Sequence, residues 1–157
     1  MRDGCLIFVG DVHLGRRPAT AADGLAACGL DARDVSPAAA WRATVDEALS
    51  VAARAVVLAG DVVESEVDRF EAFAALEAGV RRLTDAGVAV FGVAGNHDGL
   101  VLPRLAERIA GFTLLGAGGR WQVAPVPGVG APVDLLGWSF PARHHRGDPL
   151  ADPSFQA

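Results

Sequence analysis

The chain has 157 residues, which gives room for one compact domain or part of one, because domains usually run to roughly 100–150 residues. Hydrophobic residues make up 51% and charged residues 21%, so a disordered tail, a collagen and a coiled coil are excluded. The net charge of -5 argues against a protein that binds nucleic acid by charge alone. We expect a single domain over residues 1–157.

The composition and the apolar runs exclude several further classes. All 14 basic residues are Arg, which excludes a P-loop because that motif needs its lysine. The strongly apolar run at residues 88–95 is too short for a membrane helix of roughly 18 residues. The run at residues 5–9 is shorter than the signal-peptide core of about 7–15 residues. We therefore expect a cytoplasmic protein with no membrane span, in which Cys5 and Cys28 are ordinary buried thiols.

In chain order, the first apolar run, residues 5–9, predicts a buried parallel strand. Residues 14–36 show no clear period and predict a long loop. Ser36 followed by Pro37 indicates the start of a helix, and its apolar stripe predicts that the helix packs on a sheet. The run at residues 55–59 predicts a second buried strand.

A second helix is expected over residues 68–86, where apolar residues recur at helical spacing. Residues 88–94 predict a third strand, and a shorter helix follows near Leu102. Right-handed crossovers would make the first three strands parallel and bring their carboxyl ends to one edge. The chain then closes in three strand-like pieces without helices between them, at residues 112–115, 121–126 and 133–140.

Each of the first three predicted strands ends in glycine followed at once by residues that can bind metals. These endings are residues 10–13 (GDVH), 60–64 (GDVVE) and 95–98 (GNHD). One such ending is typical of a turn with an Asx hydrogen bond. Three of them at the ends of parallel strands indicate a ligand site instead.

The residue types in these endings suit a pair of cations. The spacing of Asp11 and His13 places both side chains on one face of an extended segment. Asp61 would arrive from the neighbouring strand, and a carboxylate can bridge two cations about 3.5–4 Å apart. Asn96 offers a neutral carbonyl oxygen. Oxygen and imidazole ligands without thiolate favour Mn²⁺, Fe²⁺ or Zn²⁺, and we take Mn²⁺ as the first choice.

In this order, the three segments resemble the motifs of the calcineurin-like metallophosphoesterase superfamily, which are D-x-H, G-D-x-x-D/E and G-N-H-D/E. The segment 11–15 (DVHLG) is most similar to SbcD-type DNA repair exonucleases. The resemblance implies a layered α/β/β/α sandwich and two divalent metal ions. It also implies hydrolysis of a phosphoester by a hydroxide activated between the metals, with DNA as the substrate.

The same resemblance implies a role for each motif residue. Asp11 and His13 would hold the first metal, Asp61 would bridge, and Asn96 would hold the second metal. His97 would protonate the leaving group, and Asp98 would orient His97. Glu64 would support the site, and an SbcC-type ATPase would be the partner. Apart from the resemblance, Arg16 and Arg17 follow the first motif directly and could either bind a phosphate backbone or form a solvated loop pair. A second copy of the chain is a further candidate partner.

The sequence departs from the family after these motifs, because a further His after a strand and a G-H-x-H segment are absent. The remaining histidines, His144 and His145, lie in residues 143–146 (RHHR) and are expected to form a solvated basic turn. We therefore expect that the C-terminal part of the family domain is missing, and that this chain alone binds one cation and turns over little substrate.

Two other functions remain open, and two other sequence features are interpreted as structural. The chain could hydrolyse small phosphate esters or nucleotides, or it could be an incomplete fragment that serves as a binding module. Residues 137–141 (GWSFP) begin like a hydrolase elbow but lack its final glycine and a following helix. Trp41, Phe70 and Phe73 lie at helical spacing and are expected in the core.

Overall fold

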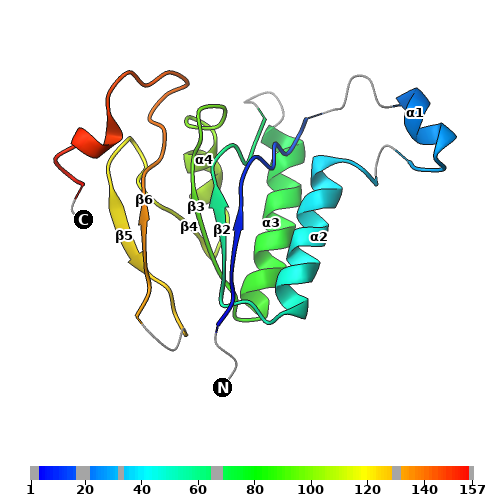
Figure 1. Ribbon diagram of the computed structural model, residues 1–157, viewed down its shortest axis with the longest axis horizontal. Coiled ribbons are helices and arrows are strands. Elements are labelled where there is room, and N and C mark those ends of the chain that lie inside the picture. The colour runs from blue at the N-terminus through cyan, green and yellow to red at the C-terminus, as the bar shows by residue number, and fades with distance from the viewer. Residues whose placement is uncertain (1–3, 17–21, 32–33, 65–68, 129–131, 156–157) are drawn as a thin grey trace.

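The structure is a computed structural model that describes residues 4–16, 22–31, 34–64, 69–128 and 132–155. Its elements alternate between strands and helices in the first two thirds of the chain and then continue in strands (Figure 1). In chain order they are β1 (Leu6–Val9), α1 (Ala22–Ala27), α2 (Pro37–Ser50), β2 (Ala55–Ala59), α3 (Arg69–Asp85), β3 (Ala89–Val93), α4 (Leu102–Ala106), β4 (Phe112–Leu114), β5 (Gln122–Pro125), β6 (Asp134–Gly137) and a 3₁₀ turn, η1 (Pro149–Ala151).

The first four strands form one parallel sheet in the order β1-β2-β3-β4. In its register Val9 lies beside Leu58, and Ala59 lies beside Val93, so the first three strands end at nearly the same level. The α/β class and the parallel arrangement predicted for these strands are confirmed. The carboxyl ends of β1, β2 and β3 consequently share one edge of the sheet.

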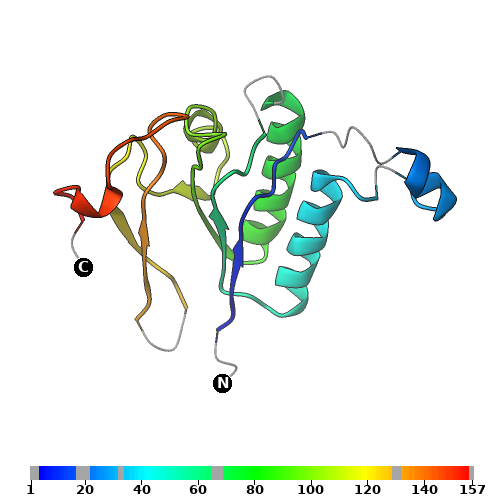
Figure 2. The same ribbon diagram turned by 45° about the horizontal axis from the view of Figure 1, so that its top comes forward.

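The sheet is covered on both faces. Helices α2 and α3 lie side by side on one face, and the antiparallel pair β5–β6 lies on the other (Figures 1 and 2). The main apolar core fills the space beneath the helices, and a smaller core between the sheets includes Val57, Phe91 and Leu135. The described residues thus supply three of the four layers that the resemblance implies.

Local sequence explains how α2 and α3 pack on each other. Ser36 caps α2 by accepting a hydrogen bond from the backbone N–H of Ala39 at 3.2 Å, and Pro37 opens the first turn. The indole of Trp41 is buried and donates to the carbonyl of Ala75 in α3 at 3.0 Å. A side chain on Gly79 would collide with this indole, which explains a glycine inside a helix.

Several local predictions are wrong. Part of the expected loop 14–36 forms the short helix α1, whose Ala-rich sequence favours helix without an apolar stripe. Cys5 and Cys28 are both exposed. Phe70 is 76% exposed because it lies in the first turn of α3, beyond the face that packs on the sheet. Among the described residues, the helices are all too short or too polar to cross a membrane.

Candidate metal centre

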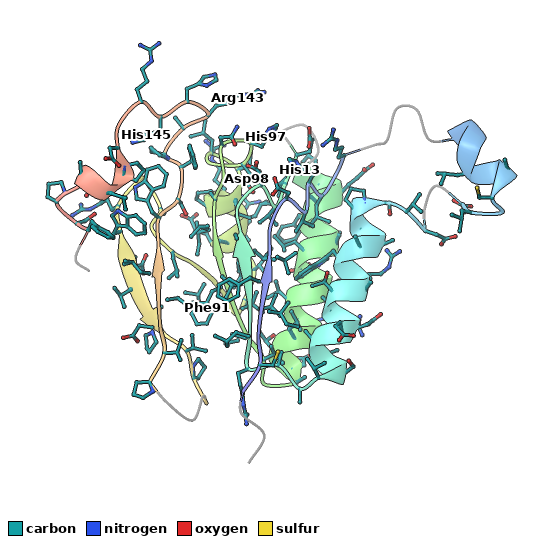
Figure 3. All side chains as sticks on the ribbon, in the orientation of Figure 1. His13, Phe91, His97, Asp98, Arg143 and His145 are labelled. Carbon is teal, nitrogen blue, oxygen red and sulfur yellow. The ribbon has the colours of Figure 1, made fainter. Side chains whose placement is uncertain are left out.

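The metal-competent side chains of the first two motifs meet at the shared edge of the sheet. Potential ligand atoms of Asp11, His13 and Asp61 all lie within 4.8 Å of one another. A second group, also within 4.8 Å, joins His13 to Glu64 and His97. The rings of His13 and His97 pack edge to face with centroids 5.2 Å apart. Figure 3 labels both residues at the same end of the molecule.

Three of these residues have a backbone conformation that aims their side chains at this edge. Asp11, His13 and Asp61 have φ values of 54°, 49° and 49°, in the left-handed region that costs about 1–3 kcal/mol per residue for non-glycine residues. Beyond the strands the two loops pair again, because Leu14 donates its N–H to Val62 at 2.8 Å. Leu14 and Val62 are fully buried, so the core holds the strained turns in place.

Glycine is required where the second and third motifs approach each other. One carboxylate oxygen of Asp61 accepts the backbone N–H of His97 at 3.0 Å. A Cβ on Gly95 would collide with this carboxylate. Gly60, with φ of 96°, lies against the Cα of Gly95, so a side chain would be both strained and crowded there. The glycines therefore allow Asp61 to sit between the two loops.

The pair His13 and Glu64 leaves two buried polar atoms without a hydrogen-bond partner among the described residues. Nδ1 of His13 and Oε2 of Glu64 lie 2.7 Å apart but lack the alignment of a hydrogen bond. Nε2 of His13 lies 3.6 Å from Oδ1 of Asp11. The two atoms face each other at ion-pair distance, and a bound cation would supply the polar partner that each lacks as a hydrogen bond. Carboxylate and imidazole groups at this edge therefore fit divalent metals.

Asp98 has a different environment from the one expected. It is fully buried, and its carboxylate accepts the backbone N–H groups of Val62 at 2.7 Å, Val63 at 3.1 Å and Gly95 at 2.7 Å. Burial raises the pKa of Asp98, and the three N–H donors oppose that rise by stabilising the carboxylate. These contacts make Asp98 an anchor between two loops.

Glu64 supplies the carboxylate near His97 that we had expected from Asp98. Glu64 is grouped with His97 in space, whereas both oxygens of Asp98 are occupied by backbone N–H groups. Sequence analysis gave Glu64 only a supporting role. The available signal in the sequence was the position of Glu64, three residues after Asp61. In the structure the backbone N–H of Glu64 donates to the carbonyl of Leu14 at 3.0 Å, which brings Glu64 back to the first motif.

The remaining candidates lie around this centre. Asn96 is partly buried and lines a neighbouring cavity. Arg16 is exposed, and Arg17 lies outside the described residues. His144 and His145 are exposed and belong to neither group of candidate ligands, which agrees with the basic turn that we predicted.

Ser139 has a structural role. It is fully buried, donates its hydroxyl to the carbonyl of Leu115 at 2.5 Å and accepts the N–H of Ala94 at 2.9 Å. With both bonds inside the protein, the hydroxyl joins the loop after β4 to the end of β3. These contacts also explain why β6 ends at Gly137, earlier than expected.

The comparison with known families agrees with the three motifs at this edge. The family model described as calcineurin-like phosphoesterase matches residues 6–148. No curated protein matches the chain. Among solved structures, the chain is similar to the nuclease MPE of Pseudomonas putida, with a TM-score of 0.46 and 20% identity. That match covers 70% of this chain and 46% of the nuclease, so the chain spans less than half of that protein's length.

Proposed function

The chain belongs to the calcineurin-like phosphoesterase family, and on this basis we propose that it forms part of a metal-dependent enzyme that cleaves phosphodiester bonds. The observation that carries the proposal is the convergence of Asp11, His13 and Asp61 at one sheet edge. Nδ1 of His13 and Oε2 of Glu64, which are buried 2.7 Å apart without a hydrogen bond, support it. Asp11, His13 and Asp61 would hold the first cation, and Asp61 with Asn96 would hold the second.

Bound divalent cations lower the pKa of a coordinated water and neutralise charge on a phosphoryl group. Mn²⁺ is the cation that we propose first, with Fe²⁺ or Zn²⁺ as alternatives. Asp61 also fixes the backbone of His97 through the 3.0 Å hydrogen bond to its N–H. This bond keeps the third motif next to the candidate ligands.

His97 is the group that we propose as general acid. Its ring lies beside that of His13, and Glu64 is the carboxylate grouped with both. An imidazole held beside the candidate ligands is a group that can donate a proton to a leaving oxygen. Asp98 would act indirectly by anchoring the backbone on either side of Asp61 and His97.

We further propose that the substrate is DNA and that the enzyme is of the SbcD type, acting with an ATPase partner. The support is the pattern of residues 11–15 together with the two later motifs. Arg16 is exposed just beyond His13, and we propose that it binds a phosphate of such a substrate.

Two measurements test the proposed function. Calorimetry with Mn²⁺ on the 157-residue chain is expected to show at least one bound cation, and absence of binding would contradict the metal centre. The product of the complete gene is then assayed with Mn²⁺ on a chromogenic diester and on linear DNA, with a chelator as control. Cleavage of the diester alone would overturn the nuclease proposal, and cleavage of neither would overturn the enzyme proposal.

A further inference from the structure

The basic segment, residues 143–146 (RHHR), lines a cavity together with Asn96, the residue that we propose for the second cation. The cavity has a volume of about 570 Å³. Figure 3 shows the labelled Arg143 and His145 on the loop beyond β6, at the same end of the molecule as His97. The cavity is lined by Asn96, Phe140, Arg143, His144, His145 and Arg146.

The start of the basic segment is fixed against the end of β3. Phe140 donates its backbone N–H to the carbonyl of Ala94 at 3.0 Å, immediately before the third motif. A Cβ on Gly99 would collide with the carbonyl of Phe140, so the two loops are in close contact. The ring of His145 packs against Trp138 with centroids 5.1 Å apart. This scaffold places the segment beside Asn96.

The charge of the segment is opposite to that of the metal centre. Arg143 and Arg146 are exposed, and neither forms an ion pair in the part of the chain that the structure describes. The described lining of the cavity includes no carboxylate. Two guanidinium groups without internal partners are suited to phosphate, which they can bind through paired N–H donors.

We propose that Arg143 and Arg146 bind phosphate groups of a nucleic-acid strand and so form a substrate-binding wall of the site. This inference rests on the proposed function, because it takes the scissile phosphate to lie at the metal centre and the bound phosphates to flank it. The cavity lies in the range of about 300–1,000 Å³ that holds drug-sized ligands, which exceeds what one phosphate needs. Asn96, shared by both regions, marks their junction.

The test measures binding without catalysis. A fluorescein-labelled oligothymidylate is titrated with the chain in EDTA at several salt concentrations, and binding is followed by fluorescence anisotropy. The double variant Arg143→Gln/Arg146→Gln is compared with Arg81→Gln/Arg82→Gln, a control with the same charge change on the exposed face of α3. Inorganic phosphate and thymidine monophosphate are added as competitors.

We expect the Arg143/Arg146 variant to bind the oligonucleotide about tenfold more weakly or worse, and the control variant to bind within about twofold of the wild type. The slope of log affinity against log salt should become shallower by about 1.4, because each lost phosphate contact on a single strand contributes about 0.7. Thymidine monophosphate and inorganic phosphate should compete only at far higher concentration.

Three outcomes would overturn the inference. The first is that the wild-type chain does not bind the oligonucleotide. The second is that both double variants lose the same amount of affinity for it. The third is that inorganic phosphate competes as effectively as unlabelled oligonucleotide, which would indicate a site for a single phosphate. Because EDTA removes divalent cations, none of these outcomes depends on Mn²⁺ binding or on turnover. The proposed function can therefore survive failure of this inference.

Discussion

The two sides of the candidate site are built in different ways. The metal side consists of strand ends in left-handed turns, held by backbone pairing and by buried Leu14 and Val62. The opposite side is the exposed basic segment 143–146, whose side chains are free of internal ion pairs among the described residues. Its start is tied into the fold by the hydrogen bonds of Ser139, and the ring of His145 packs on Trp138.

This difference matches the demands of the two kinds of ligand. A metal centre requires ligand atoms fixed within a few tenths of an ångström, so its residues belong on rigid elements. Phosphate groups on a strand can be met by long side chains that adjust their positions. We therefore expect substitutions on the metal side to affect Mn²⁺ binding or stability, and those on the basic side to affect anion binding alone.

Replacing Asp61 with Ala should have the largest effect on the metal side. The affinity for Mn²⁺ should fall about 100-fold or more, because Asp61 is the group shared by the proposed metals. Calorimetry measures the affinity, and circular dichroism should show a retained fold. Asp46→Ala is the control, since Asp46 pairs with Arg82 on the helical face. Undiminished Mn²⁺ uptake in the Asp61 variant would refute the bridging assignment.

Replacing His97 with Ala in the complete gene product should lower the hydrolysis rate by roughly 10²–10⁴-fold, which is the usual contribution of a general acid. Mn²⁺ affinity should change little, because His97 is not proposed as a ligand. A diester with a good leaving group should largely escape the loss. Equal losses for good and poor leaving groups, measured by initial rates, would contradict the role.

Replacing Asp98 with Ala should lower the free energy of unfolding by about 3 kcal/mol, because three N–H groups lose their buried acceptor. Asp98→Asn keeps one acceptor oxygen and should lose less. The neighbouring His97→Ala should cost about 0.5 kcal/mol or less. Urea denaturation measures the free energy of unfolding of the three variants. Similar losses at positions 97 and 98 would show that Asp98 is no special anchor.

The last prediction on the metal side concerns Gly95→Ala. The added methyl would collide with the carboxylate and with the backbone nitrogen of Asp61, so Asp61 must shift and Mn²⁺ affinity should fall about tenfold or more. Gly10→Ala is a matched control, since a Cβ there meets nothing within 4 Å. Calorimetry measures the Mn²⁺ affinity of both variants. Equal affinities would mean that the close approach of Gly95 and Asp61 is not needed.

The strand ends could be predicted from sequence because apolar runs and Gly-Asp endings are local signals. The expected strand 55–59 coincides with β2, and the Ser36 cap lies where it was expected. The environment of Asp98 could not be predicted, because its acceptor role depends on N–H groups 35 and 36 residues away. Adjacency in sequence indicated His97 as the partner of this carboxylate and gave no sign of the distant backbone donors.

The placement of the basic segment was also beyond sequence analysis. Residues 143–146 carry no periodic signal and were expected to be a solvated turn. Their position beside Asn96 depends on the hydrogen bonds that join Ala94 to Ser139 and Phe140, which are 45 and 46 positions away in the chain. Such long-range contacts depend on how the second sheet packs on the first, which local pattern does not specify.

The central claim is that a divalent cation binds where β1 and β2 end. Crystals of the chain grown with Mn²⁺ and measured for anomalous scattering test this claim directly. We predict an anomalous peak within coordination distance of Asp11, His13 and Asp61, and its loss in crystals of the Asp61→Ala variant. A peak elsewhere on the molecule, or the same peak in that variant, would contradict the account.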